Sequence, residues 1–227
     1  MKKITFQLIL TICILSCQIL FVKGQPTAIN DTENLINGKL WVPKIMNSKG
    51  SPLLFNKLQF KGSVLFNSVW FNEVNLAYDL EQDEVISTIN TREDTKRVVT
   101  FQKDVLHEFT IKTEKQDYNF KRGNLIHPDL KPYSYYQVTS SPNLTYIIHR
   151  EKFKKINTAI KRHEYILYNR IYIIKDGILT SIKKKRDLIE LLNSEQKLIR
   201  KYIKSKGLKI NPDHPMDAIS VIQNFDV

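Results

Sequence analysis

The side chains in this sequence that are best suited to binding chemistry are basic residues gathered in its last third. Residues 25–149 carry 14 Lys and Arg against 14 Asp and Glu, whereas residues 150–227 carry 18 against 9. Tyrosines at 165, 172 and 202 lie near the basic clusters, and basic residues interleaved with aromatic ones are typical of polyanion binding. The candidate polyanion contacts are Lys183, Lys184, Lys185, Arg186, Lys197, Arg200, Lys201 and Lys204.

The composition of these clusters narrows the kind of partner. Residues 150–227 contain 13 Lys and 5 Arg, whereas base and phosphate recognition relies on the planar fork of arginine. The pattern therefore disfavours nucleic acid and favours an acidic envelope polymer or anionic lipid head groups. The preferred interpretation of the charge itself is an ordinary solvated basic surface that keeps the protein soluble, with a specific polyanion partner as the alternative.

No motif predicts catalysis, a cofactor or a metal. The acidic run 79–84 lacks the glycine and the distal glutamate of a calcium loop, so we predict a solvated turn there. No nucleophile elbow, phosphate loop or dinucleotide fingerprint is present, so the sequence nominates no catalytic or cofactor-binding residue. Five histidines stand at no metal-ligand spacing from one another and are expected on the surface: His107, His127, His149, His163 and His214.

The first two dozen residues are typical of a secretory signal. Lys2 and Lys3 precede an uncharged apolar run at 4–22, and Val22-Lys23-Gly24 then forms a small-residue exit. We therefore predict a signal peptide at 1–24 and an exported protein that is periplasmic, outer-membrane-associated or extracellular, with no retained transmembrane helix. Two alternatives stay open, because the run is long enough to span a bilayer and because Cys17 loosely matches a lipidation site. Both cysteines of the chain lie in this segment, so no disulfide or thiol site is expected after cleavage.

The elements that must position any site are strands first and helices last. A polar leader at 25–37 precedes the strands, and within 69–78 the apolar Val74, Leu76 and Tyr78 alternate with polar residues, which is typical of a half-buried strand. Asp176-Gly177 predicts a hairpin turn between 165–172 and 178–180. The other predicted strands are 39–42, 64–66, 85–89, 98–101, 108–112, 118–121, 135–139 and 144–149.

From about residue 181 the apolar period becomes helical. A first helix begins near Lys183, and Ser194 is expected to cap a second helix that Gly207 ends. The buried stripe predicted for this second helix is Leu198, Ile199, Tyr202 and Ile203. The fold class is therefore α+β: a single domain over 38–227, with an antiparallel β-rich meander, sandwich or open barrel and a C-terminal helical tail.

Several segments resemble a class of uncharacterised exported proteins of Bacteroidetes-type bacteria. The similarity lies at 50–54 (GSPLL), 62–64 (GSV), 74–80 (VNLAYDL), 185–192, 199–204 and 217–224. It covers most of the mature chain, and it implies an envelope or secreted location and no known activity.

The hypothesis preferred from the sequence is a non-enzymatic envelope or secreted protein that acts through its surface. One alternative is an exported hydrolase or carbohydrate-active enzyme whose site is assembled in space, which a cleft with two close carboxylates would favour. The other alternative is a polyanion or anionic-lipid binder that uses the basic C-terminal third.

Overall fold

The computed structural model describes residues 39–42, 48–90, 95–159, 161–192 and 195–226. The predicted signal peptide and leader lie outside this described part. Three helices follow the last strand: α2 (Lys185–Leu192), α3 (Gln196–Ser205) and α4 (Asp217–Phe225). The strands are β1 (Ser48–Lys49), β2 (Phe60–Phe66), β3 (Val69–Asp79), β4 (Glu84–Asn90), β5 (Lys96–Thr100), β6 (Leu106–Lys112), β7 (Asp117–Arg122), β8 (Tyr135–Ser140), β9 (Leu144–Asn157), β10 (Arg162–Lys175) and β11 (Ile178–Ile182).

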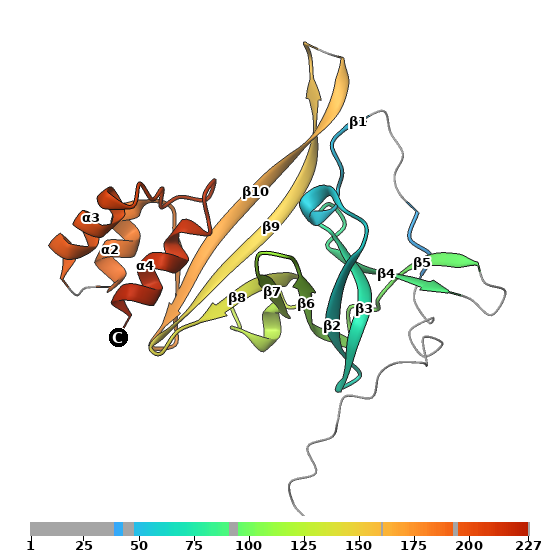
Figure 1. Ribbon diagram of the computed structural model, residues 1–227, viewed down its shortest axis with the longest axis horizontal. Coiled ribbons are helices and arrows are strands. Elements are labelled where there is room, and N and C mark those ends of the chain that lie inside the picture. The colour runs from blue at the N-terminus through green and yellow to red at the C-terminus, as the bar shows by residue number, and fades with distance from the viewer. Residues whose placement is uncertain (1–38, 43–47, 91–94, 160, 193–194, 227) are drawn as a thin grey trace, which may run out of the picture.

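All of these strands belong to one open sheet. Its order is β1-β10-β9-β8-β7-β6-β2-β3-β4-β5, and β11 also pairs with β10. The pairings are antiparallel except that of β1 with β10. Figure 1 shows the three helices gathered beside β9 and β10, away from β2 to β5. The prediction of an α+β fold with an open antiparallel meander and a C-terminal helical tail is confirmed.

The sheet curls around an aromatic core. Strand β9 is five positions from β3 in the sheet, yet the Lys152 N–H donates to the Leu80 carbonyl just after β3, at 3.1 Å. Inside the curl the rings of Phe109 and Phe120 stack with centroids 4.6 Å apart, and Tyr78 meets both edge-on. Val74, Leu76 and Tyr78 are buried in this core, as their alternation predicts.

The helices cover a second core on β9, β10 and β11. Ile148, Ile171 and Ile173 of the sheet pack there against apolar residues of all three helices. Gly207, with φ +63°, ends α3 as predicted, because this left-handed conformation suits glycine. Leu198 is 50% exposed, so its predicted place in the buried stripe is wrong. The stripe is narrower than predicted because Ile199 and Ile203, four residues apart, already occupy the buried face.

Several predicted boundaries differ from the structure. The strand expected at 39–42 is a single bridge between Leu40 and Val99. Helix α2 begins at Lys185 because the N–H groups of Lys183 and Lys184 donate to the Asp187 carboxylate before it. Helix α3 has Glu195 in the capping position, and Ser194, the predicted cap, lies outside the described residues.

The hairpin of β9 and β10 is much longer than the predicted strands at 144–149 and 165–172. Each strand has 14 residues, and their paired outer halves carry the basic cluster around Lys154. These residues are partly exposed on both faces, so they lack the apolar alternation that marks a half-buried strand.

The acidic turn after β3 is not solvated, which corrects the sequence-based prediction. Asp79 is 1% exposed and accepts hydrogen bonds from the N–H groups of Glu81 and Gln82 and from the Trp41 indole. Asp83 accepts from the Tyr78 hydroxyl at 2.6 Å and pairs with Lys103 at 3.0 Å. These carboxylates fix the turn because each is satisfied by protein donors.

The first testable prediction concerns the aromatic core. Leu76 is fully buried, so Leu76→Ala should lower the free energy of unfolding by about 2–4 kcal/mol through lost burial and a cavity. The matched control is Leu198→Ala, which should change it by less than about 0.5 kcal/mol because that side chain is half exposed. Urea unfolding measures both variants, and equal losses in the two would contradict the assignment of the core.

Candidate functional site: a cleft between β7, β8 and α4

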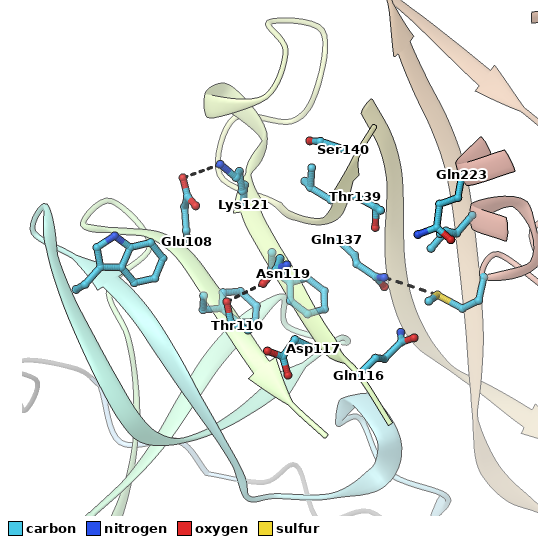
Figure 2. Close-up of a pocket in the computed structure, with 16 residues that line it drawn as sticks. Glu108, Thr110, Gln116, Asp117, Asn119, Lys121, Gln137, Thr139, Ser140 and Gln223 are labelled. Carbon is cyan, nitrogen blue, oxygen red and sulfur yellow. Dashed lines mark hydrogen bonds and ion pairs between the residues drawn. The ribbon is translucent and has the colours of Figure 1, made fainter. Parts of the chain in front are cut away.

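A cavity of about 510 Å³ lies where β7 and β8 separate. The two strands pair only through Phe120↔Gln137, Lys121↔Tyr136 and Arg122↔Tyr135, although β7 begins at Asp117 and β8 continues to Ser140. Residues from both unpaired segments line the cavity, and α4 contributes a third wall. Figure 2 shows these side chains around the cleft.

The unpaired part of β7 directs backbone polar groups into the cleft. The Gly123 N–H donates to the Ser134 carbonyl at 2.9 Å, which places Gly123 in a hydrogen-bonded pair with the residue directly before β8. Backbone groups alternate in direction along an antiparallel strand, so Asn119 and Asp117 point their N–H and C=O toward β8. The pair Phe120↔Gln137 ends the ladder and uses the Asn119 carbonyl and the Val138 N–H, so the groups that face the cleft are the Asn119 N–H and both backbone groups of Asp117.

Strand β8 presents the opposite edge in the same way. The Ser141 N–H donates to the Leu144 carbonyl at 2.9 Å, which assigns the odd-numbered residues of β8 to the ladder with β9. Val138 and Ser140 therefore point their N–H and C=O toward β7, and beyond the last ladder bond the Val138 carbonyl and both backbone groups of Ser140 face the cleft. The cleft thus lies between two strand edges that have the hydrogen-bonding capacity of a sheet edge.

Helix α4 is fixed at both ends. The Tyr146 hydroxyl of β9 donates to the Pro215 carbonyl just before the helix. Beyond its end, the Asp226 carboxylate accepts from the Ser141 hydroxyl and from the Asn143 N–H, the latter at 3.1 Å. The wall of the cleft contributed by α4 is therefore held to the sheet rather than free to swing.

A buried arginine orients the amide at the floor of the cleft. Arg150 Nε and Nη2 donate to Gln137 Oε1 at 3.1 and 2.7 Å, so the Gln137 Nε2 group points away from Arg150. The partner of Nε2 is the Met216 sulfur at 3.6 Å, a weak acceptor. Gln137 therefore offers an oriented N–H donor to a stronger acceptor in the cleft.

The charge of Arg150 is surrounded by neutral acceptors. Arg150 is 8% exposed, and besides its bonds to Gln137 its Nη1 group donates to Asn169 Oδ1 at 3.3 Å. Within the described residues no ion pair to Arg150 is found. Burial lowers the pKa of Arg150, but a guanidinium stays protonated at neutral pH. Its positive potential is therefore not cancelled locally and favours a ligand with a carbonyl or carboxylate oxygen.

The rest of the lining is mostly neutral and polar. The carboxylate of Glu108 pairs with Lys121 at 3.0 Å, which neutralises it. Apolar surface comes from Trp70 of β3, which is 41% exposed, from Ile219 of α4 and from Met216 just before that helix. The amide and hydroxyl side chains of the cleft are Thr110, Gln116, Asn119, Gln137, Thr139, Ser140 and Gln223. This set is suited to hydrogen-bonding an uncharged, chain-like ligand.

The basic residues predicted as polyanion contacts lie elsewhere. All eight are exposed on or beside α2 and α3, and none of them lines the cleft. Arg186 pairs with Glu190 at 3.2 Å. A sequence signal for Arg150 did exist, because Leu144, Tyr146, Ile148 and Arg150 alternate along one strand face and therefore share its buried side.

His149 is a second polar feature, on the opposite face of β9 from Arg150. It is 3% exposed, so its predicted place on the surface is wrong. Its ring stacks on Tyr136 with centroids 4.6 Å apart, and Nδ1 lies 3.8 Å from the Glu151 carboxylate and 3.4 Å from the Arg170 guanidinium. Burial lowers the pKa of His149 and outweighs the opposing effect of Glu151. Burial also disfavours the charged form of Tyr136, and it therefore raises the pKa of that tyrosine to about 12.

Comparison of the chain with models of protein families, with curated proteins and with solved structures gives no match. Among the described helices none is long and apolar enough to cross a membrane. In the same part of the chain, no group of three His, Cys, Asp or Glu side chains is placed to hold a metal ion.

The second prediction tests the pair at the floor of the cleft. Gln137→Leu should lower the free energy of unfolding by about 1–3 kcal/mol, because it removes the main acceptor of a buried guanidinium. The double variant Gln137→Leu/Arg150→Met should regain most of that loss, since both partners become apolar. A double-mutant cycle by urea unfolding measures this coupling, and strictly additive losses would show that the two side chains do not interact.

The third prediction concerns pH. Because the pKa of His149 is lowered in the folded state, the unfolded chain binds the proton first as the pH falls below about 6.5, and stability should fall by up to about 1.4 kcal/mol per pH unit. His149→Phe keeps the stacking on Tyr136 and should flatten this loss between pH 6.5 and 5. The control His214→Gln changes an exposed histidine and should leave the slope unchanged. Equal slopes in the wild type and His149→Phe would contradict the prediction.

Proposed function

We propose that this protein is an exported, non-enzymatic binding protein that holds an extended peptide segment in the cleft between β7 and β8. The observation that carries the proposal is the pair of facing strand edges, Asp117–Asn119 and Val138–Ser140, beyond the last ladder bond of β7 and β8. An extended peptide recognises such edges by main-chain hydrogen bonds, while side-chain pockets give specificity. Export is supported by the charged, apolar and small-residue pattern of the N-terminus.

The lining of the cleft supports a peptide in particular. The Gln137 N–H, held in place by Arg150, is a donor for a peptide carbonyl at the floor. Trp70, Met216 and Ile219 offer apolar surface for alternate side chains. Neutral amides and hydroxyls around them suit the neutral main chain, because they bring no charge that must be desolvated on binding.

The basic surface of α2 and α3 has a separate place in this proposal. Exposed lysines there attract acidic envelope polymers or lipid head groups weakly and in a salt-sensitive manner, since exposed charges are screened. In this proposal these lysines help the protein approach an acidic surface, and they do not select the ligand.

The fourth prediction tests strand addition directly. A display library of random heptapeptides should yield binders, and a selected peptide should slow amide hydrogen exchange at Asn119 and Ser140 by at least about tenfold, because both N–H groups lie beyond the ladder. Asn119→Pro should abolish binding, because proline removes the N–H that faces the cleft but no ladder hydrogen bond to β6. The matched variant Asn119→Ala keeps the N–H and should retain binding.

Three outcomes would overturn the proposal. The first is equal binding of the same peptide methylated at its backbone nitrogens, which would exclude main-chain pairing. The second is protection by the selected peptides of residues away from 117–119 and 138–140. The third is cleavage of the peptide, detected by mass spectrometry, which would support the hydrolase alternative instead.

A further inference from the structure

A second cavity, of about 730 Å³, lies between the start of β2 and the turn that joins β6 to β7. It shares no lining residue with the cleft. Three aromatic rings and four lysines contribute to its wall, together with Gln59, Thr113, Glu114 and Asn75. The rings are Phe55, Phe60 and Tyr118, and the lysines are Lys57, Lys61, Lys112 and Lys115.

The aromatic ring of Phe55 is held exposed at this cavity. Its centroid lies 4.8 Å from that of Tyr118 and 5.7 Å from that of Phe60, and yet 42% of the residue is exposed. Phe55 and Asn56 have φ values of 56° and 54°, a left-handed conformation that asparagine tolerates but that costs a residue such as Phe55 about 1 kcal/mol or more. Such a conformation persists only where surrounding contacts impose it.

Lys152 of β9 supplies the contacts that hold Phe55 and Asn56 in this left-handed conformation. Its ammonium group donates to the carbonyls of Ser51 and Leu53 at 2.9 and 2.6 Å and to Asn56 Oδ1 at 2.8 Å, which uses all three of its protons. The segment that carries Phe55 is therefore held in place by β9. A large apolar ring that is fixed in an unfavourable backbone conformation and left exposed indicates a preformed contact surface.

The charges and polar groups of the cavity specify what fits against these rings. Lys61 and Lys112 are engaged with Glu73. The Lys57 ammonium lies over the Phe60 ring, 4.9 Å from its centroid, Lys115 is exposed at the rim, and Glu114 is the acidic residue of the lining.

We propose that this cavity binds a small aromatic anion. Its flat ring packs against Phe55 and Tyr118, and its carboxylate, sulfonate or phosphate lies near Lys57 and Lys115. Charge complementarity favours the anion over a neutral or cationic ring, because the rim lysines attract it and would repel a cation. This inference is independent of peptide binding in the cleft.

The fifth prediction uses 8-anilino-1-naphthalenesulfonate as the probe, because it carries a flat ring system and one sulfonate. We expect one site that shifts the NMR signal of the Asn75 side-chain amide during titration. Lys57→Glu/Lys115→Glu should raise the dissociation constant at this site at least about tenfold. Phe55→Ala should raise it by a similar factor. The matched control Lys201→Glu/Lys204→Glu reverses two exposed charges on α3 and should leave the constant within about twofold.

Two further arms keep the test decisive. Phe55→Tyr keeps an aromatic ring at this position and should retain binding, which separates loss of the ring from loss of folding. Circular dichroism checks that each variant is folded. Competition by benzoate or by adenosine monophosphate distinguishes a simple aromatic acid from a nucleotide as the preferred form of the ligand. Unchanged binding in Lys57→Glu/Lys115→Glu, or equal binding of a cationic dye of similar size, would overturn the proposal.

Discussion

The structure depends most on the contacts of one residue, Lys152. A long antiparallel sheet has two ends, and this one is kept curled because the backbone of Lys152 bonds to Leu80 while its ammonium group bonds to the segment before β2. Those bonds bring β9 against the end of β3 across the aromatic rings between them. Burial lowers the pKa of this lysine, yet its three acceptors keep the charged form satisfied.

Both proposed binding regions trace back to the same face of β9. Arg150 and Lys152 are two residues apart and point to one side of the strand, the first toward the cleft at Gln137 and the second toward the segment of Phe55. Each cation is satisfied mainly by carbonyl and amide oxygens, not by a close carboxylate. Their positive potential therefore extends to the neighbouring cavities, whereas a close ion pair would cancel it.

The sequence was sufficient for the fold wherever a strand has one buried face. Val74, Leu76 and Tyr78 alternate, and the turn at Asp176-Gly177 was predicted correctly because both residues adopt positive φ. The cleft could not be predicted, because it depends on where the ladder of β7 and β8 stops, and that is set by the curl of the whole sheet. Likewise, Phe55 and Lys152 are almost a hundred residues apart, and only folding brings them together.

The outer edges of the sheet differ from the strand edges that face the cleft. At one end β5 carries the exposed Lys96 and Arg97 and is bridged by the chain around Leu40. At the other end β10 is covered along parts of its length by β11 and by the two-residue β1. Charges and short covering strands are ways in which proteins block edge-to-edge pairing. The facing edges at Asp117–Asn119 and Val138–Ser140 lie inside the sheet, beside mostly neutral polar side chains, and no other described strand covers them. An internal edge left open beside a lined cavity is the feature expected of a site that accepts a strand.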